Sequence, residues 1–187
     1  MNLPAVHDQA LRSTHAIVAA VKQDQWTDPT PCTEWDVRAL INHIVAENFW
    51  VEPLVAGRTI DDVGDRYDGD VLGRDPVVTY DSSARAASHA FHRPGAMDAP
   101  VAVSYGPVPG RVFARHRILD VVIHGWDVAK ATGQPTDIES DLLDACWRIV
   151  ERERDDLQES GYFGEEVAVP DGADTQTKLL AILGRER

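Results

Sequence analysis

The chain has 187 residues, of which 43% are hydrophobic and 26% are charged, a composition typical of a soluble globular domain. It carries 18 Lys and Arg against 31 Asp and Glu, and the resulting net charge of −13 disfavours binding to nucleic acid. No apolar run is long enough to span a membrane, and the start lacks a basic segment followed by an apolar core. We therefore expect no membrane contact, no signal peptide and a cytoplasmic protein.

The cysteine and histidine content limits the kinds of metal site that the chain could build. Cys32 and Cys146 are too few for a disulfide framework and lack the paired spacing of a thiolate zinc site. A metal would therefore need His and carboxylate ligands. The chain supplies an excess of acids and seven histidines, which are His7, His15, His43, His89, His92, His116 and His124.

Helical patterns fill the first third of the chain. Apolar residues recur at intervals of three and four over residues 3–22, which predicts a helix followed by a proline-rich loop. A second helix is expected from an N-cap at Thr33 to about Ala56. The Asp- and Gly-rich stretch 58–76 is predicted to be an exposed loop, and it lacks the ligand spacing of a calcium-binding loop.

The remaining chain is predicted to be helical apart from one short strand pair and the C-terminal tail. The fifth helix is expected to begin with a capping box at Thr136 to Glu139. The expected elements are a helix at 77–92, a strand pair at 100–110, a helix at 111–132, a helix from 136 to about 159, and a tail from 161 with a final turn at 177–183.

Several long amphipathic helices without internal repeats predict an all-α helical bundle, with the long loops indicating a crossover connection. We expect residues 1–160 to form the bundle and residues 161–187 to be a C-terminal tail packing on it. A homodimer is left open, since no segment specifies an interface.

The best candidate site joins the second and fourth long helices. Asp120 and His124 are four residues apart, so they project from one helix face at the border of its apolar stripe. His43 lies at the equivalent border of the second helix. If these helices are neighbours, two imidazoles and a carboxylate converge, and such a set with open positions can hold catalytic zinc, nickel or iron(II). Such a site would weaken in acid. The alternative is an ordinary Asp–His hydrogen bond and a packed histidine.

Other residues compete for roles near this point. Glu47 follows His43 by one helical turn, so it is a candidate to orient His43, to bind water or to act as a general base, with a solvated acid as the alternative. Asp127 is expected to anchor a neighbouring loop, and His116 is expected to be solvated or to lie behind the ligands. Cys32 could be a reactive thiol near a helix start or simply a small loop residue.

Three segments make the chain resemble a known family. Residues 30–45 (TPCTEWDVRALINHIV), 120–129 (DVVIHGWDVA) and 178–185 (KLLAILGR) look like the actinobacterial metal-binding proteins of the DinB/YfiT-like superfamily. The nearest kin resemble the N-terminal domain of mycothiol-dependent maleylpyruvate isomerase, and the likeness spans nearly the whole chain.

This resemblance implies a DinB-like four-helix bundle with an up-down-down-up course, here with an additional C-terminal helix and a short β-hairpin before the fourth helix. It also implies a divalent metal held by His43, Asp120 and His124. Asp120 stands where the isomerase has Glu and other branches have His. The isomerase has a further C-terminal domain at its active site, for which this chain is too short, so its specific reaction is not transferred.

Three functions remain open on these grounds. The first is a metal-dependent thiol transferase or isomerase in which zinc, first among the metals, activates mycothiol toward an electrophilic small molecule, with Glu47 as the base. The second is a non-catalytic, metal-stabilised binding or stress-related module. The third is a metal-dependent hydrolase, for which Glu47 would again supply the base.

Overall fold

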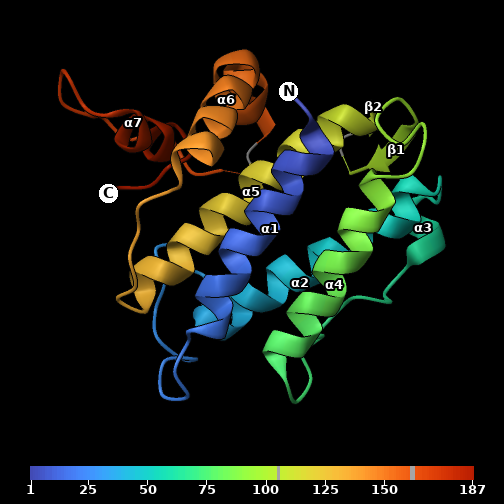
Figure 1. The fold of residues 1–187 in the computed structure, drawn as a ribbon, viewed down its shortest axis with the longest axis horizontal. Helices are drawn as coiled ribbons and strands as arrows, with labels where there is room; N and C mark the ends of the chain where they lie inside the picture. Colours follow the sequence, from blue (N-terminus) through green and yellow to red (C-terminus); the bar gives the residue numbers. More distant parts are fainter. Residues whose placement is uncertain (105, 161–162) are drawn as a thin grey trace. The chain divides into compact units, whose positions relative to one another are not determined.

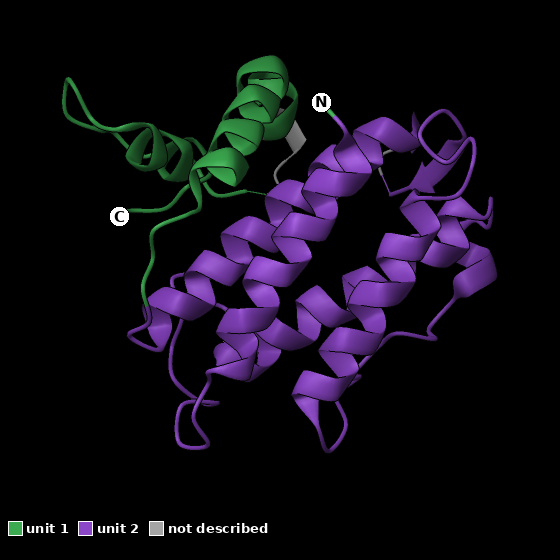
Figure 2. Cartoon of the chain, in the orientation of Figure 1, with its two compact units in different colours: residues 1, 135–187 green, residues 2–134 purple. Residues whose placement is uncertain are grey.

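A computed structural model describes residues 1–104, 106–160 and 163–187 of the chain. Tyr105, in the middle of the expected strand pair, and residues 161–162, where the expected tail begins, lie outside the described residues. The Cα positions divide the chain into two compact units, residues 2–134 and residues 135–187 with Met1 (Figure 2). The expected boundary at residue 160 stays a prediction.

The unit of residues 2–134 is a bundle of four long helices. These are α1 (Leu3–Ala19), α2 (Val37–Val55), α4 (Pro76–Phe91) and α5 (Gly110–Ala131), with a short α3 (Ile60–Val63) and an antiparallel hairpin of β1 (Pro100–Val103) and β2 (Gly106–Pro109). The most extensive contacts join α1 with α5 and α2 with α4. Figure 1 shows α1 and α5 running in one direction and α2 and α4 in the other. The predicted all-α fold with a short hairpin before the fourth long helix is confirmed.

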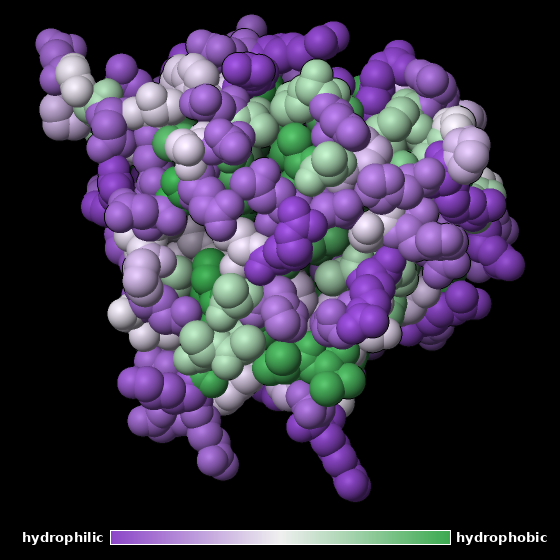
Figure 3. Space-filling model, in the orientation of Figure 1, coloured by the Kyte–Doolittle hydropathy of each residue, from purple (hydrophilic) through white to green (hydrophobic). Residues whose placement is uncertain are grey.

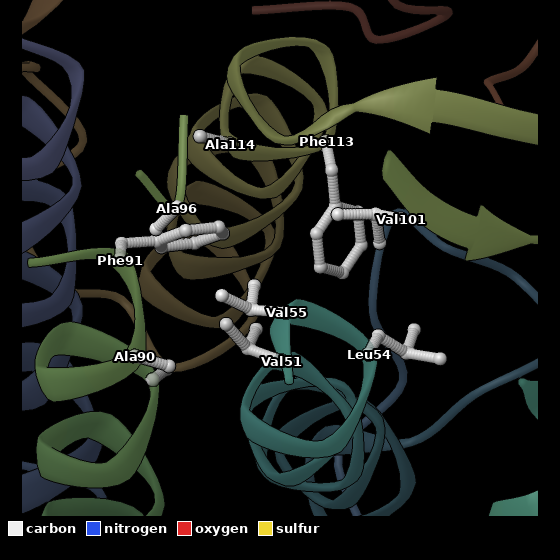
Figure 4. Packing of buried hydrophobic residues seen from close by; sticks show 10 residues of the cluster. Val51, Leu54, Val55, Ala90, Phe91, Ala96, Val101, Phe113 and Ala114 are labelled. Carbon is white, nitrogen blue, oxygen red and sulfur yellow. The ribbon is translucent and has the colours of Figure 1, made fainter. Parts of the chain in front are cut away.

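One hydrophobic cluster fixes the end of the bundle next to the hairpin. It is built from the last turns of α2 and α4, the first turns of α5, and Val101 of β1. Phe91 and Phe113 meet edge to face at 5.8 Å between ring centroids, and Figure 4 shows their side chains beside Val51 and Val55. This cluster packs the last turns of α2 and α4 against the first turns of α5.

The second helix begins later than the sequence suggested. Its N-cap is Asp36, whose Oδ1 accepts from the Ala39 N–H at 2.8 Å, rather than Thr33. The hydroxyl of Thr30 donates to the carbonyls of Cys32 and Trp35, and Pro29 and Asp36 pair as an isolated β-bridge. These contacts fold residues 29–36 into a compact turn, so Thr33 has no helix to cap.

The acidic loop 58–76 is tied to α2. Asn42 donates to the carbonyl of Gly69 and accepts from the N–H of Val71, both at 2.8 Å, and Arg38 pairs with Asp70 at 2.6 Å. Helix α3 within this loop was not expected; Thr59 and Asp62 cap its four residues reciprocally.

On the face shown in Figure 3, hydrophilic side chains surround small hydrophobic patches over α1 and α4.

The unit of residues 135–187 contains α6 (Ser140–Ser160) and α7 (Thr175–Ile182). The expected helix start at Thr136 is wrong, because Gln176 of α7 donates to the Thr136 carbonyl and accepts from the Ile138 N–H. Gln176 thus occupies the Thr136 carbonyl, which would accept the first intrahelical hydrogen bond of a helix capped at Thr136. No helix in the described parts of the chain is both long and apolar enough to cross a membrane.

Candidate metal centre

The three side chains expected to converge do so in the four-helix unit. His43 lies in the second turn of α2, and Asp120 and His124 lie one turn apart on α5. Each offers one ligand atom, and these atoms lie within 4.8 Å of one another. The hydrophobic stripes of α2 and α5 face each other in the bundle, which brings the polar borders of the two stripes together.

One oxygen of Asp120 faces both imidazoles. Its Oδ1 lies 3.3 Å from Nε2 of His43 and 3.5 Å from Nε2 of His124. The two rings are nearly perpendicular, with centroids 5.0 Å apart. The separations are long for hydrogen bonds and close to the roughly 3.4 Å between neighbouring ligand atoms around tetrahedral zinc.

The other oxygen of Asp120 is held by a buried arginine that the sequence did not single out. Nη1 of Arg117 lies 2.9 Å from Oδ2 of Asp120 and 3.3 Å from Oε2 of Glu47, and Nη2 lies 3.4 Å from Oδ1 of Asn48. Only 4% of the Arg117 side chain is exposed. Arg117 therefore turns into the bundle toward two carboxylates, and the role expected for its neighbour His116 stays a prediction.

Asp127 contacts His124, and the expected anchoring of a neighbouring loop by Asp127 stays a prediction. Its Oδ2 lies 3.2 Å from Nδ1 of His124, one turn earlier on α5, and the carboxylate is fully buried. A carboxylate at Nδ1 keeps the proton on that nitrogen and leaves the Nε2 lone pair available. The four-residue spacing in the sequence identified the pair of Asp120 and His124. The three-residue spacing between His124 and Asp127 would likewise have identified the pair of His124 and Asp127.

The compact turn 29–36 covers the same point. The indole of Trp35 stacks on the ring of His43, with centroids 4.6 Å apart, and meets the ring of His124 edge-on at 5.8 Å. Cys32, half-buried in the same turn, forms a second potential ligand group with His124 and Asp127. Trp35 and Cys32 had no assigned role at this centre, since only the turn brings them to it.

The charges around the centre shift two pKa values. Burial alone would lower the pKa of His124, but the carboxylates of Asp120 and Asp127 raise it to about 9. Burial also opposes ionisation of Asp120, yet Arg117 and the two imidazoles hold its pKa well below the ordinary value. Without a metal, His124 and Asp120 thus form an ion pair, and a metal would have to displace the His124 proton.

Glu47, His89 and His92 lie outside these ligand groups. Glu47 projects toward Arg117 and belongs to neither potential ligand group. His92 pairs with Asp8 at 2.9 Å, and His89 is exposed. Among the described residues, the only two groups with ligand spacing are His43, Asp120 and His124, and Cys32, His124 and Asp127.

The donor set fits a borderline divalent ion. Two imidazole nitrogens and one carboxylate oxygen are ligands that zinc accepts at catalytic sites, and such sites keep a further position for water or substrate. The carboxylate behind His124 is the outer partner that metal-ligating histidines usually have. The residues present therefore fit a divalent metal.

The fold and site define the class of protein as a four-helix bundle with a candidate metal centre between α2 and α5. The chain belongs to the mycothiol maleylpyruvate isomerase N-terminal domain family, whose model matches residues 7–129. The matched range lies within the four-helix unit and contains His43, Asp120 and His124.

Two curated proteins and one solved structure are similar to this chain. Uncharacterized proteins from two strains of Mycobacterium tuberculosis are each 38% identical over 136 residues, which cover 73% of this chain and 70% of theirs. The crystal structure of a mutant of mycothiol-dependent maleylpyruvate isomerase superposes with a TM-score of 0.68 at 13% identity, covering 90% of this chain and 75% of the isomerase chain. At that identity the superposition supports the fold.

Proposed function

We propose that this protein binds a divalent metal, zinc first among the candidates, through His43, Asp120 and His124, and uses it in a mycothiol-dependent transfer or isomerisation of an electrophilic small molecule. The observation that carries the proposal is the orientation of one Asp120 oxygen toward the Nε2 atoms of both histidines. Membership of a family whose name includes mycothiol supports the choice of thiol. A cytoplasmic location suits the proposal, since low-molecular-weight thiols stay reduced there.

A bound divalent ion lowers the pKa of a coordinated thiol, which makes the thiolate the nucleophile at neutral pH. The chain's own residues would prepare the centre for it. Asp127 holds the His124 ring with Nε2 directed at the point where His43, Asp120 and His124 converge, called the ligand point below. Trp35 covers the His43 ring, which limits the access of water to one side.

Thiol chemistry is favoured over hydrolysis by the environment of Glu47. Hydrolysis needs a general base that takes a proton from water, and Glu47 is the candidate. Its Oε2 lies 3.3 Å from the Arg117 guanidinium, so the carboxylate is engaged by a cation rather than free to face a metal-bound water. A thiol, already more acidic than water, requires less of that base, so Glu47 remains the candidate base for the thiol reaction.

The test is a metal titration followed by addition of thiol. Metal-depleted wild-type protein and the His43→Ala and His124→Ala variants would be titrated with Zn²⁺ against a chromophoric chelator and with Co²⁺ by visible spectroscopy. We expect one ion per wild-type chain, a loss of at least a hundredfold in affinity in each variant, and a change in the Co²⁺ spectrum on addition of mycothiol.

Two outcomes would separate the alternatives. Metal binding that raises the melting temperature without any spectral response to mycothiol, and without turnover of electrophiles, would indicate a metal-stabilised module rather than an enzyme. Failure of the wild-type protein to bind Zn²⁺ or Co²⁺ would reject the proposed centre itself.

A further inference from the structure

We propose that Arg117 is a positioning residue that restricts Asp120 to one ligand oxygen and keeps the loaded centre cationic, which favours an anionic ligand such as a thiolate. The inference rests on the proposed metal centre. It assigns a role to a residue that does not face the ligand point.

The geometry of the Asp120 carboxylate is the first argument. Its Oδ1 faces His43 and His124, while its Oδ2 accepts from Nη1 of Arg117 at 2.9 Å. With Oδ2 engaged by the guanidinium, Oδ1 is the oxygen that the carboxylate presents to a metal. The pair is charge-assisted and one turn apart on α5, so the arrangement is rigid.

The burial of Arg117 is the second argument. With 4% of its side chain exposed, the guanidinium cannot swing into solvent to release Asp120. Asn48, which is fully buried, accepts from Nη2 and itself donates to the hydroxyl of Ser83 at 3.3 Å. Arg117 is thus held from behind by the packed contact of α2 with α4.

The balance of charge is the third argument. With neutral imidazoles, Asp120 and the buried Asp127 behind His124 together carry −2, and Arg117 cancels one of these two charges. Glu47, the other partner of Arg117, lies farther from the guanidinium at 3.3 Å and has 37% of its side chain exposed, so solvent screens it more strongly. A divalent ion would then leave the loaded centre with a net positive charge, and an anionic ligand would be favoured at the open position.

Removal of Arg117 should change the Zn²⁺ affinity in the opposite direction from removal of a residue with a merely structural role. In the metal-free protein Arg117 compensates the Asp120 charge, so Arg117 and the metal compete for the same carboxylate. Removing Arg117 should destabilise the metal-free fold and yet tighten metal binding. A residue that only supported the fold would weaken both when it is removed.

The experiment compares wild-type protein with Arg117→Gln, Arg117→Lys and the control Arg38→Gln. The control removes one positive charge from α2 at an exposed pair with Asp70, away from the ligand point. Zn²⁺ affinity would be measured by chelator competition, the melting temperature without metal by circular dichroism, and azide binding by the spectrum of the Co²⁺-loaded protein.

We expect Arg117→Gln to bind Zn²⁺ roughly ten- to a hundredfold more tightly, to melt at a lower temperature without metal, and to bind azide more weakly. Arg117→Lys keeps the charge but cannot contact Asp120 and Asn48 through two separate nitrogens, so its Zn²⁺ affinity should rise severalfold. Arg38→Gln should match the wild type. If Arg117→Gln does not fold, Arg117→Lys carries the test.

Unchanged or weaker Zn²⁺ binding in the folded Arg117 variants, with normal binding by the wild type, would overturn this inference and leave the metal centre intact. Absence of Zn²⁺ binding by the wild type would instead overturn the proposed function. Tighter Zn²⁺ binding together with unchanged azide binding would also contradict the inference, because the cationic role would then be wrong.

Discussion

Nδ1 of His124 lies 3.2 Å from Oδ2 of Asp127, a carboxylate that is fully buried one turn further along α5. The contact fixes which ring nitrogen carries the proton and therefore which one can bind a metal. Asp127 thus acts on the candidate centre through His124, from the side opposite Asp120.

Replacing Asp127 by Ala should lower the affinity for Zn²⁺ roughly ten- to a hundredfold, because the His124 ring loses its orientation and some basicity. Chelator competition would measure the effect. Asp81→Asn, on an exposed pair with Arg85 on α4, is the matched control and should leave the affinity unchanged. Equal affinities of Asp127→Ala and wild type would show that the contact does not support the ligand.

The sequence predicted the parts of the site that depend on local helical spacing. Asp120 and His124 are neighbours on any helix, and His43 needed only the packing of α2 against α5. Arg117 could not be predicted, because its direction depends on Glu47 and Asn48 from another helix. Trp35 reaches the site only through the turn held by Thr30.

The difference between local sequence signals and contacts from other segments also explains which helix boundaries were predicted correctly. Periodicity predicted α4 and α5 to within a residue, since their ends coincide with Pro, Gly and hairpin residues in the sequence. The starts of α2 and α6 were misplaced because the contacts of Thr30 and Gln176 outweigh good local capping residues. Local capping is worth about 1 kcal/mol, so two competing hydrogen bonds of about 0.5 to 1.5 kcal/mol each can outweigh it.

The Trp35 indole, stacked on His43, should slow release of the metal. Trp35→Ala removes an aromatic contact worth about 0.5 to 1.5 kcal/mol and opens the ligand to water, so Zn²⁺ should dissociate roughly three- to tenfold faster into excess chelator. Trp35→Phe keeps a ring and should release the metal at nearly the wild-type rate. The control Trp50→Ala, whose side chain packs near the hairpin end, should not change this rate. Identical release from Trp35→Ala and wild type would contradict the covering role.

Gly125 permits the close approach of α1 and α5 beside His124. A Cβ added at this position would lie 2.5 Å from Oγ1 of Thr14, whose hydroxyl donates to the Val121 carbonyl at 3.0 Å. Gly125→Ala should therefore lower the free energy of unfolding by about 1 to 3 kcal/mol, measured by urea denaturation. In a double-mutant cycle, Thr14→Ala should recover part of this loss, because it removes two of the three crowded atoms. Additive effects would mean that the helices separate freely.

His7 makes the fold sensitive to acid independently of any metal. Its side chain is fully buried edge-on to Phe91, and neither ring nitrogen has a hydrogen-bond partner within the described part of the chain. Burial, assisted by the Arg117 charge, lowers the pKa of His7 to about 3. Between about pH 3 and 6.5 the unfolded chain therefore binds a proton at His7 that the folded chain does not, so stability falls as the pH falls.

His7→Leu should remove this part of the pH dependence. Between pH 7.5 and pH 5.0, the free energy of unfolding of the wild type should fall by about 2 kcal/mol more than that of His7→Leu, measured by urea denaturation of metal-free protein. His89→Gln, at an exposed position on α4, should retain the wild-type slope. Parallel curves for wild type and His7→Leu would mean that His7 titrates normally in the folded protein, and that the bundle admits either water or an acceptor beside its ring.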